Sequence, residues 1–376
     1  MSSSAARLII ASSETCADLY WATRFYVPDP IVFFEHRGRK ILVASDLEYG
    51  RAKKEAEVDR VISYSDCEKK LKKKGKEKIG EGDILDFLFK ERKVRTLQVP
   101  SYFPIRQAEI LKKKGYRIEP VPDPFFPERE IKSAEEKKYI VESLRATERG
   151  IEAAIEVLQR AKIKKGKIYR NGTPLTSEEL RKVIEMKMME LGAIGQHTIV
   201  ACGRQAADPH CRGFGPLYAN QTIVLDVFPK SARTGYHGDI TRTVLKGRAS
   251  KTLKKMYAAV RQAQENGIKT IRAGVDASKV HGIVSQTMEQ QGFKTGYIRG
   301  KPQGFIHSTG HGLGLDIHEA PRVSRLSNIL KKGNVVTVEP GLYYDDLGGI
   351  RIEDVVYVTN GGCEVLTKIP KIFEIL

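Results

Sequence analysis

The chain has 376 residues, of which 41% are hydrophobic, and a formal net charge of +18 at pH 7. This length predicts two domains, and the apolar share is enough for a packed core, which excludes a globally disordered protein. No apolar run approaches the roughly 18 residues that a membrane-spanning helix needs, so we expect no membrane protein.

The basic excess is dispersed over the sequence. The lysines form short clusters, such as Lys69–Lys78 and Lys162–Lys167, that are interleaved with glutamates and lack interleaved aromatic residues. This pattern favours a solvated surface over a nucleic-acid interface. The five scattered cysteines cannot all pair internally, and the first apolar run is too short for a secretory signal. We therefore expect reduced thiols and a cytoplasmic protein.

Residues 1–125 are predicted to form a small α/β domain. Short apolar runs of strand length (LII, PIVFFEH, KILVAS, RVISY and TLQVP) alternate with segments of helical spacing (DLEYGRAKKEA, GDILDFLFKER and FPIRQAEILKKKG). A glycine in Arg37–Lys40 indicates a hairpin turn between two of the strands. The alternation predicts a mixed or parallel sheet with helices packed on it, and nothing in this domain indicates catalysis.

Residues 126–376 are predicted to form the second domain, after a proline-rich linker at Pro120–Glu130. Ser133 and Glu136 form a capping-box pattern at the start of a long amphipathic helix, and Thr176 and Ser177 offer a cap for the next one. Strands follow, and a similar order of two helices and then strands recurs after about 115 residues. The repeat predicts two similar half-domains with a cleft between them.

Five side chains on these predicted strands or strand ends suit a metal site: Asp226, Asp239, His311, Glu339 and Glu353. Four carboxylates and one imidazole, without thiols, fit one or two divalent cations of the Mn, Co or Zn type. Carboxylates gathered in one place also require a compensating positive charge. The interpretation is a two-metal hydrolase site, although Glu353 beside Arg351 is also compatible with a simple salt bridge.

The segments that carry these residues resemble the pita-bread metallopeptidases, family M24, which include methionine aminopeptidase, aminopeptidase P and prolidase. The segments are VLDVFP, GYHGDITRT, HSTGHGLGLDIHE, VTVEPGLYY and IRIEDVV. Residues 1–125 resemble the creatinase-type N-terminal domain of the proline-specific branch, so the resemblance covers the whole chain. It implies an α/β (α+β) fold in which a small creatinase-like domain precedes a pseudo-symmetric pita-bread catalytic domain.

The resemblance also implies roles for the five ligands. Asp226 would bind one metal ion, Asp239 and Glu353 would bridge two ions, and His311 and Glu339 would complete the second site. The implied cofactors are two divalent ions, with Mn preferred and Co or Zn as alternatives. A homodimer is the implied assembly.

Further residues match substrate-contacting positions of the family. His210, His318 and Glu339 are the implied catalytic residues. His307, Tyr343 and Arg351 are the implied substrate-binding residues. The spacing from Asp226 to Asp239 is slightly longer than is usual in the family, and the extra residues fall in PKSARTG, which we expect to form a hairpin tip. Such an extension costs little closure entropy and leaves both strands in register.

The expected function is hydrolysis of the bond before proline, in dipeptides or at peptide N-termini. A methionine aminopeptidase fits less well, because the separate N-terminal domain, His307 and the RIED segment point to the proline-specific branch. A non-enzymatic pita-bread binding protein is a further alternative, although such proteins generally lack several ligands. The sequence leaves dipeptidase and aminopeptidase open, with a preference for the former because the compact N-terminal domain resembles that of small microbial prolidases.

Overall fold

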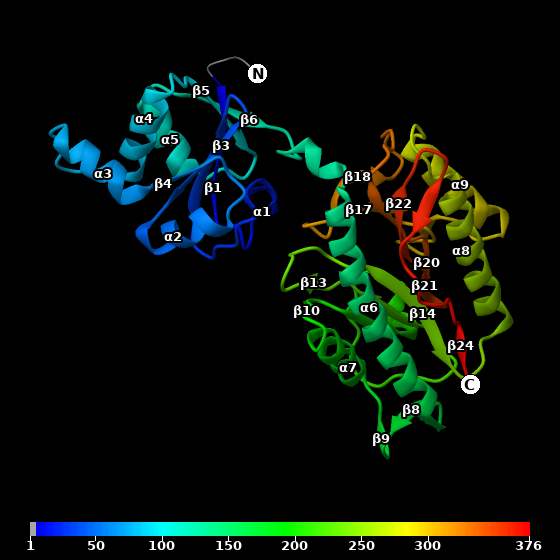
Figure 1. Ribbon diagram of the computed structural model, residues 1–376. Helices are drawn as coiled ribbons and strands as arrows, with labels where there is room; N and C mark the ends of the chain where they lie inside the picture. The colour runs from blue at the N-terminus through cyan, green and yellow to red at the C-terminus, as the bar shows by residue number, and fades with distance from the viewer. Residues whose placement is uncertain (1–4) are drawn as a thin grey trace. The chain divides into compact units, whose positions relative to one another are not determined.

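The computed structural model describes residues 5–376 and divides into two compact units, Met1–Arg129 and Glu130–Leu376 (Figure 1). Residues 1–4, which begin the segment considered above for a secretory signal, lie outside the described residues. The predicted boundary at 125/126 falls four residues before the observed division.

The N-terminal unit contains one six-stranded mixed sheet in the order β4-β3-β2-β1-β5-β6. Its strands are β1 Ala5–Ala11, β2 Ile31–His36, β3 Arg39–Ala44, β4 Arg60–Ser63, β5 Thr96–Pro100 and β6 Arg117–Val121. Its helices are α1 Ala17–Thr23, α2 Asp46–Glu55, α3 Tyr64–Lys73, α4 Glu81–Glu91 and α5 Ile105–Lys113. The pairs β1–β2 and β2–β3 are antiparallel, whereas β3–β4, β1–β5 and β5–β6 are parallel. A mixed sheet with helices is what the sequence predicted.

The predicted hairpin turn is present between β2 and β3. His36 pairs with Arg39, and the two intervening residues, Arg37 and Gly38, have φ angles of 53° and 72°. A two-residue turn needs such left-handed backbone to match the strand twist, which explains the glycine.

The proline-rich segment is more ordered than a simple linker. Pro120 lies in β6 at the edge of the sheet, where the absence of an N–H is tolerated. Phe125 and Phe126 are 1% and 2% exposed and contribute to the core of the N-terminal unit. Arg129 forms a buried ion pair with Asp18 at 2.8 Å. These contacts explain why the compact unit extends past the prolines to Arg129.

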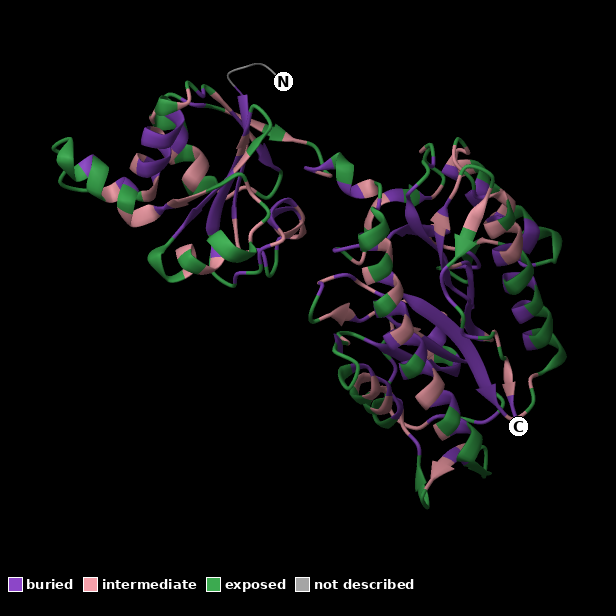
Figure 2. Cartoon of the chain, in the orientation of Figure 1, coloured by how far each residue is buried: buried purple, intermediate pink, exposed green. Residues whose placement is uncertain are grey.

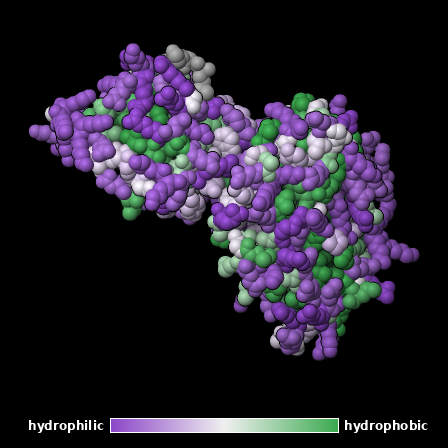
Figure 3. All heavy atoms as spheres, in the orientation of Figure 1, coloured by the Kyte–Doolittle hydropathy of each residue, from purple (hydrophilic) through white to green (hydrophobic). Residues whose placement is uncertain are grey.

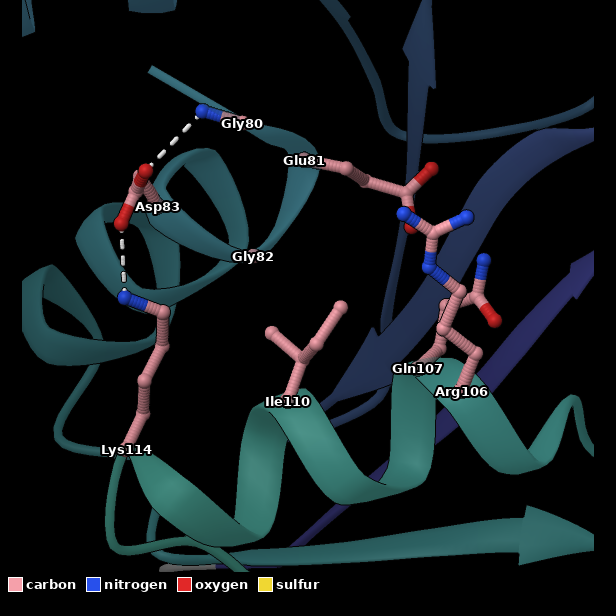
Figure 4. Close-up of a pocket in the computed structure, with 8 residues that line it drawn as sticks. All are labelled: Gly80, Glu81, Gly82, Asp83, Arg106, Gln107, Ile110 and Lys114. Carbon is pink, nitrogen blue, oxygen red and sulfur yellow. Dashed lines mark hydrogen bonds and ion pairs between the residues drawn. The ribbon is translucent and has the colours of Figure 1, made fainter. Parts of the chain in front are cut away.

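A hollow of about 350 Å³ lies between α4 and α5 of this unit (Figure 4). Its carboxylate Asp83 accepts from the Gly80 N–H at 2.9 Å and pairs with Lys114 at 2.7 Å. Gly82 allows the two helices to approach, because a Cβ there would lie 2.3 Å from the Ile110 side chain. The polar groups of the hollow therefore hold the two helices together, and none of the ten predicted site residues lines it.

The C-terminal unit contains two larger sheets, each covered by a helix pair. The first half has α6 Ala134–Arg160, α7 Ser177–Met189 and the sheet β11-β12-β14-β24. The second half has α8 Lys251–Thr270, α9 Ala277–Gln290 and the sheet β18-β17-β19-β22-β23. Helix α6 packs against β12 and β14, and α8 packs against β19. This repetition is the predicted pair of half-domains.

Most strands of these two sheets are largely buried. Their bounds are β11 Ile199–Cys202, β12 Ile223–Val227, β14 Ile240–Lys246, β24 Glu374–Ile375, β17 Gly310–Gly312, β18 Glu319–Val323, β19 Val335–Val338, β22 Asp354–Val358 and β23 Cys363–Val365. Smaller pairings involve β7 Lys162–Lys164, β8 Lys167–Arg170, β9 Thr173–Pro174, β10 Ala193–Ile194, β13 Lys230–Ser231, β15 Gly296–Ile298, β16 Lys301–Gln303, β20 Gly341–Tyr344 and β21 Gly348–Arg351. Figure 2 shows β14 buried along its whole length.

Local sequence signals explain where the long helices begin. Ser133 accepts from the Glu136 N–H while Glu136 accepts from the Ser133 N–H, which is the predicted capping box of α6. Thr176 caps α7 through the Glu179 N–H, and Ser250 caps α8. The predicted hairpin tip is different in detail, because part of it forms β13 and pairs with β10.

Hydrophilic side chains cover most of the face of each unit shown in Figure 3, as the dispersed lysines predicted. Within residues 5–376, the helices are all too short or too polar to cross a bilayer.

Candidate metal centre

The first sheet presents two carboxylates on one face. Asp226 in β12 pairs with Thr241 in β14, and Asp239 precedes Thr241 by two positions. Directly opposed residues share a face, and residues two apart on a strand share it as well. Strand register therefore directs Asp226, Thr241 and Asp239 to the same side. The longer connection between the two aspartates leaves this register intact.

The second sheet presents the other ligands in the same way. Val338 pairs with Asp354, so Glu339 and Glu353 continue the two strands side by side. Gly312 pairs with Val336, which sets His311 beside Thr337, and Thr337 precedes Glu339 by two positions. His311, Glu339 and Glu353 thus come from three neighbouring strands or strand ends.

Hydrogen bonds join the two sheets at this point. The Glu353 N–H donates to the Thr241 carbonyl at 3.0 Å, and the Arg351 N–H donates to Thr243 Oγ1 at 2.9 Å. The five predicted side chains consequently meet in one group, here named the acidic cluster: Asp226, Asp239, His311, Glu339 and Glu353. Asp239, His311 and Glu353 are buried, and the other two are half-buried.

Three members of the acidic cluster lie close enough together to share an ion. One donor atom each from Asp239, His311 and Glu353 lies within 4.8 Å of the other two. His311 Nε2 is 3.2 Å from Glu339 Oε1 and 3.6 Å from Asp239 Oδ2. Asp226 belongs to the same group through Thr241, whose Oγ1 is 3.0 Å from Asp226 Oδ1 and 2.9 Å from Glu353 Oε2.

The electrostatics of the cluster are unfavourable without a cation. Burial raises the pKa of Asp239 well above its usual value, and the charges of Glu353 and Asp226 raise it further. Burial likewise raises the pKa of Glu353, with added repulsion from Glu339 and Asp226. Burial also acts to raise the pKa of Glu339, but the hydrogen bond and charge of His311 outweigh it and lower that pKa to about 2.

One oxygen of the cluster has an unmet bonding capacity. Glu353 Oε1 is buried and lacks a hydrogen-bond partner among residues 5–376. Buried carboxylate oxygens normally have a partner, because desolvation is costly. Carboxylate oxygens and an imidazole nitrogen that lie together around such an oxygen suit a divalent cation of the Mn, Co or Zn type.

The three predicted substrate-binding residues form a chain of contacts that ends at the acidic cluster. Arg351 Nη2 donates to Asp226 Oδ2 at 2.6 Å, and Arg351 Nη1 donates to the Tyr343 hydroxyl at 2.7 Å. His307 Nε2 lies 3.0 Å from the same hydroxyl. Arg351 therefore pairs with Asp226, whereas the sequence also allowed a salt bridge with Glu353.

The two remaining histidines lie at the edge of this group. His318 is exposed, and its ring centroid is 4.3 Å from that of His311. His210 is also exposed, and the preceding residue, Pro209, accepts from Arg351 Nη2 at 3.4 Å. Both imidazoles are accessible to a ligand beside the cluster.

Two threonines of the site were not foreseen. Thr241 contacts Asp226 and Glu353, and it also accepts from Arg351 Nε at 3.2 Å. Thr337 Oγ1 accepts from the His311 N–H at 3.1 Å and donates to Glu339 Oε1 at 3.2 Å. Each lies two positions from a ligand on the same strand, so the period-two rule would have found both.

Comparison with known proteins identifies the family. The model of metallopeptidase family M24 matches residues 138–360, which is more than half of the chain. The chain belongs to metallopeptidase family M24. The matched region contains all five residues of the acidic cluster. The predicted family is therefore confirmed.

Relatives of this M24 chain agree with the assignment. It is 31% identical to a Xaa-Pro dipeptidase of Pyrococcus horikoshii over 279 residues, which are 73% of this chain and 74% of that protein. The crystal structure of an X-Pro aminopeptidase from Thermotoga maritima aligns with 98% of this chain over 97% of its own length, with a TM-score of 0.81 and 25% identity. The structure of a prolidase from Pyrococcus furiosus aligns with 97% of this chain over 96% of its own length, with a TM-score of 0.78 and 27% identity. The expected pita-bread fold class is thereby confirmed.

Proposed function

We propose that this chain is a metal-dependent Xaa-Pro peptidase, which hydrolyses the peptide bond before a proline in the second position. The observation that carries the proposal is the convergence of Asp239, His311 and Glu353 within 4.8 Å in a member of family M24. The names of the similar proteins, Xaa-Pro dipeptidase, X-Pro aminopeptidase and prolidase, supply the substrate class.

The acidic cluster is assigned to two divalent ions, with Mn preferred and Co or Zn as alternatives. In this proposal Asp226 would hold one ion, His311 and Glu339 would hold the other, and Asp239 and Glu353 would contribute to both. A pair of bound ions supplies a water nucleophile at neutral pH and polarises the scissile carbonyl.

Glu339 is the proposed proton carrier. Its carboxylate lies within the acidic cluster, 3.2 Å from His311 Nε2, where it is placed to accept a proton and deliver it to the leaving nitrogen. A proline nitrogen carries no hydrogen in the peptide, and the bond cannot break cleanly until that nitrogen is protonated. The contacts of Glu339 with His311 and Thr337 fix the carboxylate for this transfer.

His318 and His210 are proposed to contact the substrate and the developing oxyanion. Partial desolvation lowers the pKa of His318 although the residue is exposed, and the nearby His311 lowers it further, so its imidazole is neutral at pH 7. A neutral imidazole offers one donor and one acceptor, which suits a peptide group.

His307, Tyr343 and Arg351 are proposed to shape the side of the site that receives proline. The Tyr343 ring is 5.4 Å from the His307 ring, and the Tyr343 side chain is buried. Rigid ring surfaces complement a proline ring, which cannot donate a backbone hydrogen bond. A homodimer and a cytoplasmic location stay predictions from the sequence.

The proposal is tested with a dipeptide and a longer peptide, each with proline second, and with matched peptides that carry alanine there. The protein is treated with a chelator and then receives Mn²⁺, Co²⁺ or Zn²⁺ separately. We expect metal-dependent cleavage of the proline peptides only. Cleavage of the dipeptide alone selects a dipeptidase, and cleavage of the longer peptide selects an aminopeptidase. Preferential cleavage of Met-Ala peptides, or no metal-dependent hydrolysis, would overturn the proposal.

A further inference from the structure

A buried histidine outside the predicted site residues lies behind the acidic cluster. His281 belongs to α9, is 5% exposed, and has its Nδ1 2.9 Å from Thr309 Oγ1. Its ring centroid is 5.2 Å from that of Phe305, with the two planes tilted by 33°. One imidazole therefore contacts two residues of the segment that leads to His311.

Thr309 connects this histidine to a residue of the acidic cluster. The Thr309 carbonyl accepts from the Glu339 N–H at 2.8 Å, and the Thr309 N–H donates to the Val323 carbonyl at 2.9 Å. Thr309 is fully buried and precedes His311 by two positions. A shift of Thr309 would thus displace the backbone of Glu339 and the strand that carries His311.

Phe305 connects the same histidine to the substrate-binding residues. Its ring lies between two imidazoles, 5.2 Å from His281 and 5.4 Å from His307, the latter in an edge-on arrangement of 76°. His307 in turn reaches the Tyr343 hydroxyl. Removal of the His281 ring would leave Phe305 free to move away from His307.

The charge state of His281 suits a structural hydrogen bond. Burial lowers its pKa to about 4, and the positive charge of Arg325 and a coulombic contribution from His307 act in the same direction. The ring is therefore neutral at pH 7, with one donor nitrogen and one acceptor nitrogen. Such a ring makes a specific bond to the Thr309 hydroxyl without adding a cation behind the cluster.

We propose that His281 is a positioning residue, which fixes Glu339 through Thr309 and fixes His307 through Phe305. Hydrogen-bond partners of metal ligands orient those ligands, and their removal typically lowers metal affinity or activity by about 10- to 100-fold. The expected effect of His281 on catalysis rests on the proposed function. The expected effect on metal affinity rests on the hydrogen bond between the Thr309 carbonyl and the Glu339 N–H.

The test compares four single variants and one double variant with the wild type. His281→Leu removes the hydrogen bond, His281→Asn keeps a polar group at the position of Nδ1, and Thr309→Val removes the partner. Val280→Ala, a buried change in the same helix within the hydrophobic cluster that includes Ile271 and Leu330, is the control for lost stability. Mn²⁺ affinity is measured by isothermal titration calorimetry, and kcat and KM are measured with an Xaa-Pro dipeptide.

We expect His281→Leu to weaken Mn²⁺ binding and to lower kcat/KM by about 10- to 100-fold, with most of the activity restored in His281→Asn. The double variant His281→Leu/Thr309→Val should be no worse than either single variant, because both remove the same bond. Additive losses, or losses no larger than those of Val280→Ala, would overturn the inference. If the wild type does not cleave Xaa-Pro peptides, the proposed function fails, and the Mn²⁺ affinities alone decide the role of His281.

Discussion

Asp239 and Glu353 carry most of the electrostatic cost of the acidic cluster. Both are buried, both have a raised pKa, and Glu353 Oε1 lacks a hydrogen-bond partner among the described residues. An acid whose folded pKa is raised holds its proton more tightly in the folded state, so folding is favoured at low pH and disfavoured as the pH rises. Glu339, with a pKa of about 2, has the opposite sign, but its contribution is constant above about pH 5.

Asp239→Asn is therefore expected to stabilise the metal-free protein while it abolishes metal-dependent hydrolysis. The wild type loses stability as the pH rises above the ordinary aspartate value of 3.8, and the variant lacks that loss. The two proteins should be equally stable near about pH 4, and the variant should be the more stable one near about pH 8. Urea unfolding after chelation measures this difference. A variant that is less stable at every pH would contradict the electrostatic account.

Thr241 is the second residue whose replacement is informative. Its hydroxyl contacts Asp226, Glu353 and Arg351, so Thr241→Val keeps the shape of the side chain and removes three polar contacts. We expect kcat/KM to fall by about 10- to 100-fold and Mn²⁺ affinity to fall as well. Thr287→Val, which removes a hydroxyl that bonds within α9 and to Asn266 of α8, is the matched control and should change neither quantity. Steady-state kinetics and calorimetry provide the measurements, and equal effects in both variants would refute a specific role for Thr241.

At the scale of elements, β17 shows why glycines flank His311. A Cβ on Gly310 would lie 1.9 Å from the Thr337 carbonyl oxygen, and one on Gly312 would lie 2.3 Å from that of Ala320. Neighbouring backbones approach so closely here that no side chain fits on either position. The glycines thus allow β17 to lie between β18 and β19 with His311 directed at the cluster.

Gly310→Ala is expected to destabilise the protein by about 1–3 kcal/mol, because overpacking forces the strands apart. The same shift should displace His311 and weaken metal binding. Gly282→Ala is the matched control, because Gly282 is exposed in α9 and a Cβ there meets nothing within 4 Å. That variant should gain about 0.5–1 kcal/mol from helix propensity. Thermal and chemical unfolding measure both changes, and similar effects of the two alanines would count against the packing argument.

The elements also show what sequence could and could not predict. The convergence of the five side chains in the acidic cluster was predictable because each lies in or next to an apolar strand, and strand alternation then fixes the face on which it lies. Helix α3 was missed because it is rich in lysine, and only Cys67 and Leu71 are buried on it. His281 was missed because its partners, Thr309 and Phe305, come from a distant segment, which local periodicity does not report.

At the scale of the whole molecule, the acidic cluster is a local exception in a basic chain. The net charge of +18 is dispersed over short lysine clusters, whereas the four carboxylates lie within the C-terminal unit. A basic surface attracts anions over long range, and such steering weakens with ionic strength. The dispersed charge therefore bears on the rate of association with anions, whereas metal binding is proposed for the acidic cluster.

Metal binding should link the acidic cluster to the stability of the C-terminal unit. An ion that binds only the folded state stabilises it by about 2.7 kcal/mol at a free concentration of 100 Kd. We expect Mn²⁺ to raise the Tm of the chelated protein and calorimetry to give two ions per chain.

Variants of two residues of the acidic cluster test the two-ion assignment. Asp226→Asn should retain one tighter ion, because Asp226 is assigned to one ion only. Glu353→Gln should impair the binding of both ions, because Glu353 is assigned as a bridge. Glu156→Gln, an exposed change on α6, should behave as the wild type. A single ion in the wild type, or the same loss in Asp226→Asn and Glu353→Gln, would disprove the two-ion assignment.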